Sequence, residues 1–230
     1  MRRIAALLLC LCLVPLRAEA APETKYVALT FDDGPSGRYT RHLLEGLWER
    51  DVKATFLLCG YRIAQFPELT REIYAQGHEI GHHGYSHASM KTMSRRDIAR
   101  ELQETEALLP PGCQPAFFRP PGGEVTDAVT QVATARQLAV LRWSVDPRDW
   151  ATGDAVAVES AVLEKVRDGD IILLHDMTDS SVRAALEIID RLKEQGFRFV
   201  TVSELARLRD VRILPGKTYT CFRGKEEAVK

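Results

Sequence analysis

Short apolar runs alternate along the chain with segments in which apolar residues recur at helical spacing. The apolar runs predict seven strands, over residues 26–31, 54–59, 78–81, 117–118, 139–145, 170–174 and 197–202. The segments between and after them predict seven helices, over residues 41–50, 63–76, 94–109, 127–137, 155–167, 181–195 and 203–209. Glycines at 77 and 196 end two of these helices, and Ser94 with Asp97 resembles a capping pair at the start of another.

This alternation determines the expected fold class. Strands that are each followed by a helix indicate parallel strands joined by right-handed crossovers. Seven such units predict an α/β fold in which about seven parallel strands form a closed or nearly closed barrel, although an open doubly wound sheet has the same pattern. No linker-like stretch interrupts the alternation, so we expect a single domain over residues 21–209, followed by a polar C-terminal tail over residues 210–230.

The first twenty residues do not fit the alternation. A positive start, with Arg2 and Arg3, is followed by an almost unbroken apolar run over residues 4–16, and small residues at Ala18 and Ala20 occupy the positions that a signal peptidase reads. The run is shorter than the ~20 residues that a membrane-spanning helix needs. We therefore predict a signal peptide over residues 1–20 and a secreted protein, periplasmic or extracellular, without stable membrane insertion.

Composition and charge exclude several classes of protein. With 45% hydrophobic and 27% charged residues the chain is not of the disordered type. Its 31 basic and 32 acidic residues leave a formal charge of -1, so no basic field points to a nucleic-acid partner. We expect a monomer.

After the signal peptide three cysteines remain. Cys59 in an apolar run is interpreted as a buried residue, and Cys113 and Cys221 are candidates for one disulfide.

Polar residues without a packing explanation fall at the C-terminal ends of the predicted strands, where parallel α/β folds place their sites. Asp32 and Asp33 directly follow the first strand and precede a Gly-Pro turn. Two adjacent carboxylates at this point suggest a bound cation or a pair of coupled acids. The alternative is a turn in which one Asp serves as a cap.

Four of the six histidines lie within residues 78–87. His83 and His87 are four residues apart, so on one helical turn both imidazoles would face the same way and could bind one metal ion. His78 and His82 are either donors behind the ligands or packing residues. The chain has no HExxH motif, so a zinc-protease interpretation loses its main support.

Two histidines and one carboxylate form a three-ligand site for a divalent ion with open positions for water and substrate. The carboxylate should come from Asp32 or Asp33. The other Asp would then lie beside the activated water, where it could act as general base.

Three later strand ends add to this set of polar residues. Arg119 is followed by two prolines and two glycines, and residues 143–150 end a strand with two Asp and a second Trp. His175 follows the apolar residues 171–174. A single His after an apolar strand is by itself as consistent with the core as with a site, but its place on the same rim favours a site.

These five segments, in this order, resemble the motifs of the polysaccharide deacetylases of carbohydrate esterase family 4, the NodB-homology group. The motifs are TFDDGP at 30–35, HxxxH at 83–87, RPP at 119–121, DxxDW at 146–150 and LxH at 173–175. The resemblance spans residues 26–208 and implies a distorted (β/α) barrel. It also implies a hydrolase that removes N-acetyl groups from an N-acetylhexosamine-containing glycan, peptidoglycan or a chitin-like polymer.

The resemblance implies a role for each matching polar residue. Asp33, His83 and His87 match the ligands of one divalent ion, usually zinc, with cobalt, nickel or manganese as alternatives. The catalytic roles match four further residues: Asp32 as general base, Arg119 as the residue that holds this base, His175 as general acid, and Asp149 as the carboxylate that tunes His175.

The substrate-binding residues carry the departures from the family pattern. Trp150 and Leu173 match walls of the acetyl-binding groove, and Pro121, Gly122 and Tyr85 are the other candidates. Many members have Trp in place of Tyr85, an aromatic residue in place of Gly122, and Asn where this chain has His82. The Gly122 N–H could still serve an oxyanion hole, but a sugar-facing ring is lost, which bears on substrate preference.

Two other functions fit part of this pattern. The same chemistry could act on an O-acetyl ester, for example in acetylated xylan, and no motif separates amide from ester. An inactive carbohydrate-binding protein could use the same scaffold. Loss of Asp32 or His175 would have suggested that function, and both residues are present.

Overall fold

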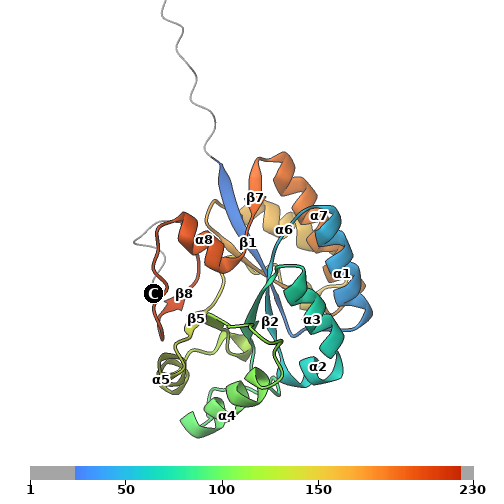
Figure 1. The fold of residues 1–230 in the computed structure, drawn as a ribbon. Helices are drawn as coiled ribbons and strands as arrows, with labels where there is room; N and C mark the ends of the chain where they lie inside the picture. The colour runs from blue at the N-terminus through green and yellow to red at the C-terminus, as the bar shows by residue number, and fades with distance from the viewer. Residues whose placement is uncertain (1–23, 224–230) are drawn as a thin grey trace, which may run out of the picture.

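The structure, a computed structural model, describes residues 24–223 (Figure 1). The predicted signal peptide lies outside the described residues. The strands of the described chain are β1 Lys25–Asp32, β2 Thr55–Leu58, β3 Glu79–His82, β4 Phe117–Phe118, β5 Ala139–Leu141, β6 Ile171–His175, β7 Phe197–Phe199 and β8 Thr218–Tyr219. Its α-helices are α1 Arg38–Glu49, α2 Gly60–Gln65, α3 Pro67–Ala75, α4 Arg95–Glu106, α5 Asp127–Ala135, α6 Ala155–Lys165, α7 Asp179–Glu194 and α8 Val202–Leu208, and two 3-10 turns are η1 Pro121–Gly123 and η2 Asp149–Ala151.

The strands form one sheet with the order β6-β1-β2-β3-β4-β5-β8, and β7 pairs with the first part of β1. The pairings between these strands are parallel. The sheet curls until its two ends meet, through a bridge between Val145 and Ile172 and another between Asp170 and Cys221. The predicted single-domain, distorted (β/α) barrel is therefore confirmed, and β8 adds to the seven predicted strands.

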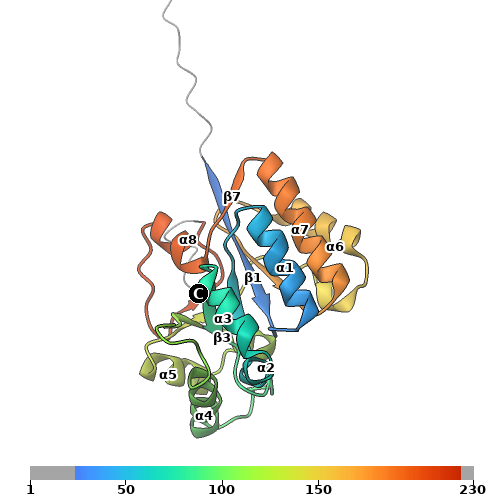
Figure 2. The ribbon, with the colours of Figure 1, turned by 45° about the vertical axis from the view of Figure 1, so that its right-hand side comes forward.

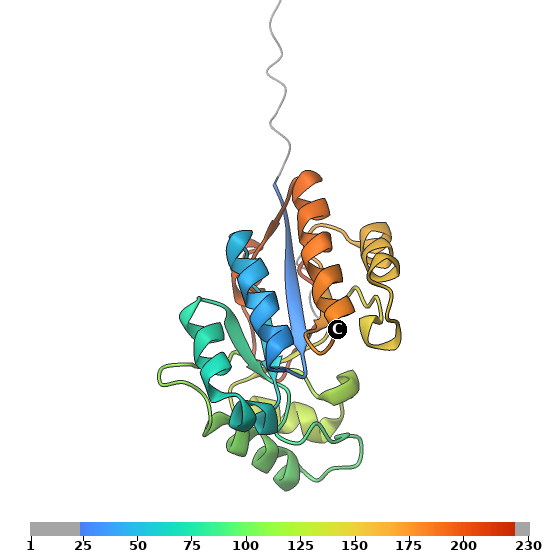
Figure 3. The same cartoon turned by 90° about the vertical axis from the view of Figure 1, so that its right-hand side faces the viewer.

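The helices cover the outer face of this sheet. Figures 2 and 3 show α1 and α7 side by side along β1, with α6 against α7. Within residues 24–223, no helix combines the length and the apolar composition that crossing a membrane requires.

Alternation along β1 separates an outer from an inner face, because successive side chains of a strand point to opposite sides of the sheet. Leu29 and Phe31 belong to the cluster beneath the helices, whereas Ala28 belongs to the cluster inside the barrel. Thr30 and Asp32 share the parity of Ala28 and therefore face inward. The last polar residue of β1 thus lies at the mouth of the barrel.

The neighbouring strand β6 follows the same rule. Ile172 and Leu174 pack in the outer cluster and Ile171 in the inner one, so Leu173 and His175 face inward. The register pairs Asp32 with His175 across the two strands. Strand pairing therefore places these two inward-facing polar residues side by side at the barrel mouth.

One predicted helix is wrong. The apolar spacing over residues 63–76 predicted a single helix, but the structure has two, α2 and α3, separated at Phe66 (φ -131°, ψ 57°). Pro67 cannot donate a helical hydrogen bond, and it disfavours the helical conformation of the residue before it. The same proline then begins α3, where a missing N–H costs nothing.

Two of the three described cysteines are buried and one is partly buried. Cys59 is fully buried at the end of β2, as predicted, and burial raises the pKa of its thiol well above the ordinary value. Cys113 is a free thiol that packs against the outer cluster, while Cys221 is buried beside the inner one. The considered disulfide between Cys113 and Cys221 is thus absent from the structure.

The residues after α8 pack against the barrel as far as Arg223. Tyr219 and Phe222 are fully buried in the inner cluster, with their rings stacked 5.5 Å apart. The Phe222 N–H donates to Gly169 O (2.7 Å), and Arg223 Nε donates to buried Asp170 (2.7 Å). These contacts fill the end of the barrel where β6 begins, opposite the rim that carries the motifs.

We expect Phe222→Ala to lower the free energy of unfolding by about 3–5 kcal/mol, because it removes a fully buried ring and leaves a cavity. Denaturant unfolding of the purified protein measures this loss. Lys217→Ala, an exposed position in the same segment, is the matched control and should change little. Equal effects of the two substitutions would contradict the role of this segment in the core.

Candidate active site and metal centre

The motif residues meet at the carboxyl end of the barrel around a cavity of about 400 Å³. Its walls come from residues that are far apart in sequence but follow neighbouring strands. The lining residues are Asp32, Asp33, His83, His87, Gly122, Trp143, Asp146, Trp150, Leu173 and His175.

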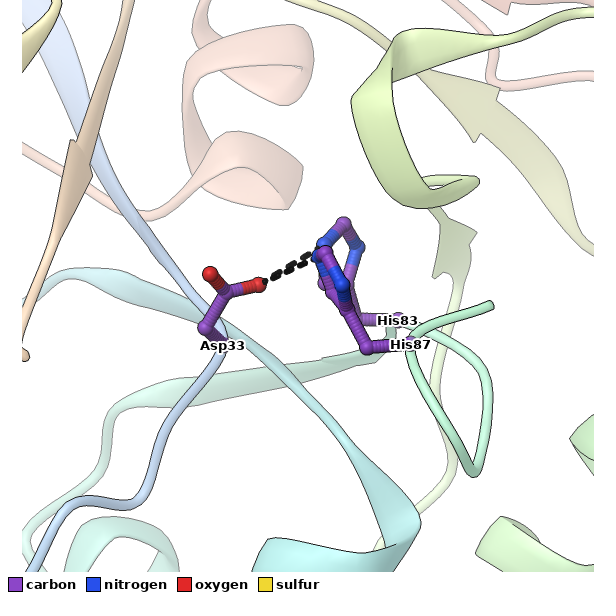
Figure 4. Close-up of side chains that lie close together, drawn as sticks. All are labelled: Asp33, His83 and His87. Atoms are coloured by element: carbon purple, nitrogen blue, oxygen red, sulfur yellow. Dashed lines mark ion pairs between the residues drawn. The ribbon is translucent and has the colours of Figure 1, made fainter. Parts of the chain in front are cut away.

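Asp33, His83 and His87 form a compact group of metal-ligating atoms. Asp33 Oδ1 lies 3.2 Å from His83 Nε2 and 2.9 Å from His87 Nε2, and Figure 4 shows the carboxylate pointing at both rings. This oxygen is buried and has no well-aligned hydrogen bond. Two ring nitrogens and an oxygen that converge without such a bond fit a divalent cation between them.

Electrostatics within this group favour an ionised Asp33. Burial by itself would raise the pKa of this carboxyl, but the adjacent His83 and His87 rings outweigh it and hold the pKa well below its ordinary value. The same Asp33 carboxylate raises the pKa of His87.

His83 is held by the sheet and by a backbone carbonyl. Its N–H donates to Leu58 O (2.9 Å) at the end of β2, and its Nδ1 lies 2.7 Å from Arg119 O. The carbonyl can only accept, so Nδ1 carries a proton, and in the neutral ring Nε2 is the nitrogen left to bind a cation. A ligating histidine is commonly fixed in this way.

The prediction that His83 and His87 share a helical turn is wrong. The residues between them form a loop, in which Gly84 (φ 79°) and His87 (φ 60°) adopt left-handed conformations. These values turn the chain back on itself instead of continuing a helix. The two rings still come within 5.2 Å of each other, so a metal-binding pair arises from a different backbone path.

Asp32 has a different set of partners from its neighbour. Arg119 Nη1 donates to Asp32 Oδ1 (2.6 Å) and to Thr30 Oγ1 (2.9 Å), and this guanidinium is fully buried. Asp32 Oδ2 lies 3.8 Å from His83 Nε2, beside the convergent group. The geometry therefore separates the two carboxylates: Asp33 belongs to the ligand group and Asp32 to Arg119.

His175 is bound twice by Asp149. The His175 ring Nδ1 lies 2.8 Å from Asp149 Oδ1, and the His175 backbone N–H donates to Asp149 Oδ2 (2.9 Å). Burial would lower the pKa of this imidazole, but the hydrogen bond and charge of Asp149 outweigh it and raise the pKa to about 9. His175 is therefore an imidazolium at neutral pH, with Nε2 available toward the cavity.

Most of the predicted site residues come together here. Arg119 and Asp149 are buried behind the lining, while Trp150, Leu173 and Gly122 form part of it. Two candidates do not line the cavity. Pro121 is buried within η1, and the Tyr85 ring packs over Gly60, where an added Cβ would come within 2.3 Å of it.

Two lining residues were absent from the predicted site. Trp143 continues the inner parity of Ala139 and Leu141 beyond the end of β5, so extending the alternation by one step would have found it. Asp146 belongs to the DxxDW segment, and its carboxylate accepts the N–H of Arg148 (2.8 Å).

The arrangement supplies the parts of a hydrolytic site. Next to the group that could hold a cation lies a carboxylate acceptor, Asp32. An imidazolium donor, His175, is paired with Asp32 on the neighbouring strand. An acceptor and a donor of protons on either side of a bound carbonyl group are suited to water attack and leaving-group departure. The fold and the site together fit a hydrolase with a candidate site for a divalent cation.

Comparisons with known proteins agree with this class. Residues 19–141, more than half of the chain, match the polysaccharide deacetylase family. A peptidoglycan-N-acetylglucosamine deacetylase of Bacillus cereus is 36% identical over 197 residues, 83% of this chain and 92% of that protein. A chitooligosaccharide deacetylase of Sinorhizobium fredii is 36% identical over 200 residues, 80% of this chain and 92% of that protein.

A solved structure agrees as well. The family 4 acetyl xylan esterase of Clostridium thermocellum, in complex with a cobalt ion, superimposes with a TM-score of 0.80 at 36% identity, covering 86% of this chain and 98% of that one. The chain belongs to the polysaccharide deacetylase family, in the NodB-homology group of carbohydrate esterase family 4, and is an enzyme of that family.

We expect Asp149→Asn to lower the pKa of His175 from about 9 toward the ordinary ~6.5 or below, because the stabilising anion is lost while burial remains. Titration of the His175 ring by NMR measures this change. In the Asp146→Asn control the pKa should stay near about 9. A drop in this control, with none in Asp149→Asn, would transfer the tuning role to Asp146.

Proposed function

We propose that this chain is a secreted, metal-dependent N-deacetylase that releases acetate from N-acetylhexosamine residues of a glycan, either peptidoglycan or a chitin-like polymer. One observation carries the proposal. The Asp33–His83–His87 group, the Asp32–Arg119 ion pair and the His175–Asp149 pair all surround a single cavity.

The proposed cofactor is one divalent ion, most simply zinc. Two imidazoles and one carboxylate suit Zn²⁺, and they also accept cobalt, nickel or manganese. Asp33, His83 and His87 would hold the ion. When bound, it would polarise the acetyl carbonyl and lower the pKa of a coordinated water.

Asp32 and Arg119 would serve the first half of the reaction. Asp32 accepts the proton of the water that attacks the acetyl carbonyl carbon. Arg119 orients the Asp32 carboxylate, and it leaves Oδ2 on the side of the ligand group because it binds Oδ1.

His175 would serve the second half of the reaction. Its Nε2 gives a proton to the sugar nitrogen as the carbon–nitrogen bond breaks, and the products are acetate and a free amine on the glycan. Asp149 supports this step because it keeps the ring protonated and fixes its orientation through two hydrogen bonds.

The substrate would lie against the aromatic wall of the cavity. Trp143 and Leu173 line the interior, and Trp150 is largely exposed at the rim, where an indole face can stack on a sugar ring. Gly122 has no side chain to obstruct the cavity, and its N–H is a candidate donor to the acetyl oxygen. Tyr85 and Pro121 would support the wall of the cavity from behind, because neither lines it.

Secretion fits this substrate class. The predicted signal peptide over residues 1–20 would export the enzyme to the periplasm or the medium, where such glycans occur. One relative is named for peptidoglycan and another for chitooligosaccharide, which supports an N-acetylated glycan. We expect the enzyme to act as a monomer.

The runner-up is O-acetyl ester hydrolysis, supported by the likeness to the acetyl xylan esterase. The same water attack would release acetate from an ester, with His175 giving its proton to the departing sugar oxygen. A binding protein without activity is less favoured, because the acceptor Asp32 and the donor His175 are both present and correctly paired.

Acetate release tests this function directly. Purified enzyme is incubated with chitooligosaccharide, peptidoglycan and acetyl-xylan, with and without a chelator. We expect acetate from an N-acetylated glycan, loss of this release with chelator and its return with Zn²⁺. His83→Ala, which lacks one proposed ligand, is the metal-deficient control and should release little acetate. Release from acetyl-xylan alone would favour the esterase, and no release from any substrate would favour the binding protein.

Asp32→Asn and Asp33→Asn should fail in different ways. Asp32→Asn should retain bound zinc and lose turnover by about 10²–10⁴-fold, because it removes the proton acceptor and leaves the ligand group intact. Asp33→Asn should lose zinc and activity together. Elemental analysis and kcat on the same preparations compare the two variants, and the reverse pattern of zinc retention would exchange the two roles.

A further inference from the structure

The two histidines of the ligand group are held to very different degrees. The side chain of His83 is 2% exposed and is fixed by β3, by Leu58 and by the Arg119 carbonyl. The side chain of His87 is 42% exposed and lies four residues further on, within the loop. The position of His87 Nε2, 2.9 Å from Asp33 Oδ1, therefore depends on the backbone of residues 84–86.

A carboxylate outside the motifs holds this backbone. Glu101 Oε2 accepts the N–H groups of Tyr85 (2.7 Å) and Ser86 (2.8 Å), and Glu101 Oε1 accepts the Ser86 hydroxyl (2.8 Å). Three hydrogen bonds that two consecutive residues donate to one carboxylate are charge-assisted and stronger than neutral ones.

The opposite side of the loop is held by α2. The N–H groups of Gly60 and Tyr61, at the start of that helix, donate to Gly84 O (2.9 Å) and Tyr85 O (3.0 Å). The first residues of α2 have no partners within the helix, so the loop satisfies them. The donors of the loop thus go to Glu101 and its acceptors to α2.

The helix that carries Glu101 is itself rigidly placed. Ser94 caps α4, accepting the Asp97 N–H (3.2 Å), and Ile98 and Leu102 are fully buried in the cluster beneath it. Gly84 fits the remaining space, because a Cβ there would lie 3.3 Å from Glu101 Oε2 and 3.0 Å from the Met90 side chain. The loop is therefore seated against a fixed surface.

We propose that Glu101 is a positioning residue for the metal centre. Its carboxylate holds residues 85 and 86 in the path that brings His87 next to Asp33, so that the least buried ligand is preorganised for the ion. Glu101 does not line the cavity, and it acts through His87. This inference rests on the metal centre of the proposed function.

The test is the Zn²⁺ dissociation constant, measured by competition with a chromogenic chelator at a temperature where each variant is fully folded. Loss of a residue that supports a metal ligand typically weakens affinity 10–100-fold, so we expect a loss of this size in Glu101→Ala. In Glu101→Gln the loss should be smaller, because the amide oxygen still accepts hydrogen bonds.

Glu104→Ala is the matched control, since Glu104 is exposed on the same helix. It should bind Zn²⁺ like the wild type. In Glu101→Ala, kcat at saturating Zn²⁺ should stay close to the wild-type value, because the acceptor Asp32 and the donor His175 are untouched. A merely structural role would lower the melting temperature without this separation of Zn²⁺ affinity from kcat.

An unchanged Zn²⁺ dissociation constant in folded Glu101→Ala would overturn the proposal, and so would a fall in kcat at saturating Zn²⁺ with unchanged affinity. If Glu101→Ala does not fold, Glu101→Gln and Ser86→Ala replace it, and wild-type affinity in both would equally overturn it. Failure of the wild-type enzyme itself to bind Zn²⁺ would instead remove the proposed metal centre, and this inference with it.

Discussion

The buried guanidinium of Arg119 is the interaction on which the rest of the site depends. It binds Asp32 and Thr30 from β1, and its Nη2 donates to Arg142 O (3.0 Å) beyond β5. The backbone carbonyl of Arg119 orients the His83 ring. A fully buried charge must be paired, and removing one partner of such a pair typically costs about 3–5 kcal/mol. The requirement to pair Arg119 therefore draws together the ends of three strands and the first histidine ligand.

Pairing also explains why the two adjacent aspartates have different partners. Asp32 is the last inward-facing residue of β1, so it points at Arg119 and stands in register with His175. Asp33 has left the strand, with φ at 73°, and its carboxylate turns toward the two histidines. Two adjacent residues thus place one carboxylate against the Arg119 guanidinium and the next against the two imidazoles.

Several parts of the structure could be predicted because they depend on neighbours in the chain. Strands such as β1 and β6 are buried on both faces, so their sequences are apolar runs. Ser94 is an N-cap residue and predicts the start of α4. Pro67 also signals the split between α2 and α3, but the apolar spacing on its two sides is that of one continuous helix. The path from His83 to His87 was not readable, because a spacing of four suits a helical turn and a folded-back loop equally.

The sequence by itself determined the order of strands and helices along the chain and the segments that would meet at one rim. These features follow from steric and burial preferences that act within a few residues of chain. Only the tertiary structure decided which contacts each Asp makes, how β8 and Phe222 fill the barrel, and that Glu101 holds the backbone before His87. Those outcomes rest on hydrogen bonds and packing between residues far apart in the chain. Glu101 and Tyr85 are separated by 16 positions in the sequence, and Arg119 and Asp32 by 87. No local pattern encodes such partners, because they become neighbours only when the sheet has curled.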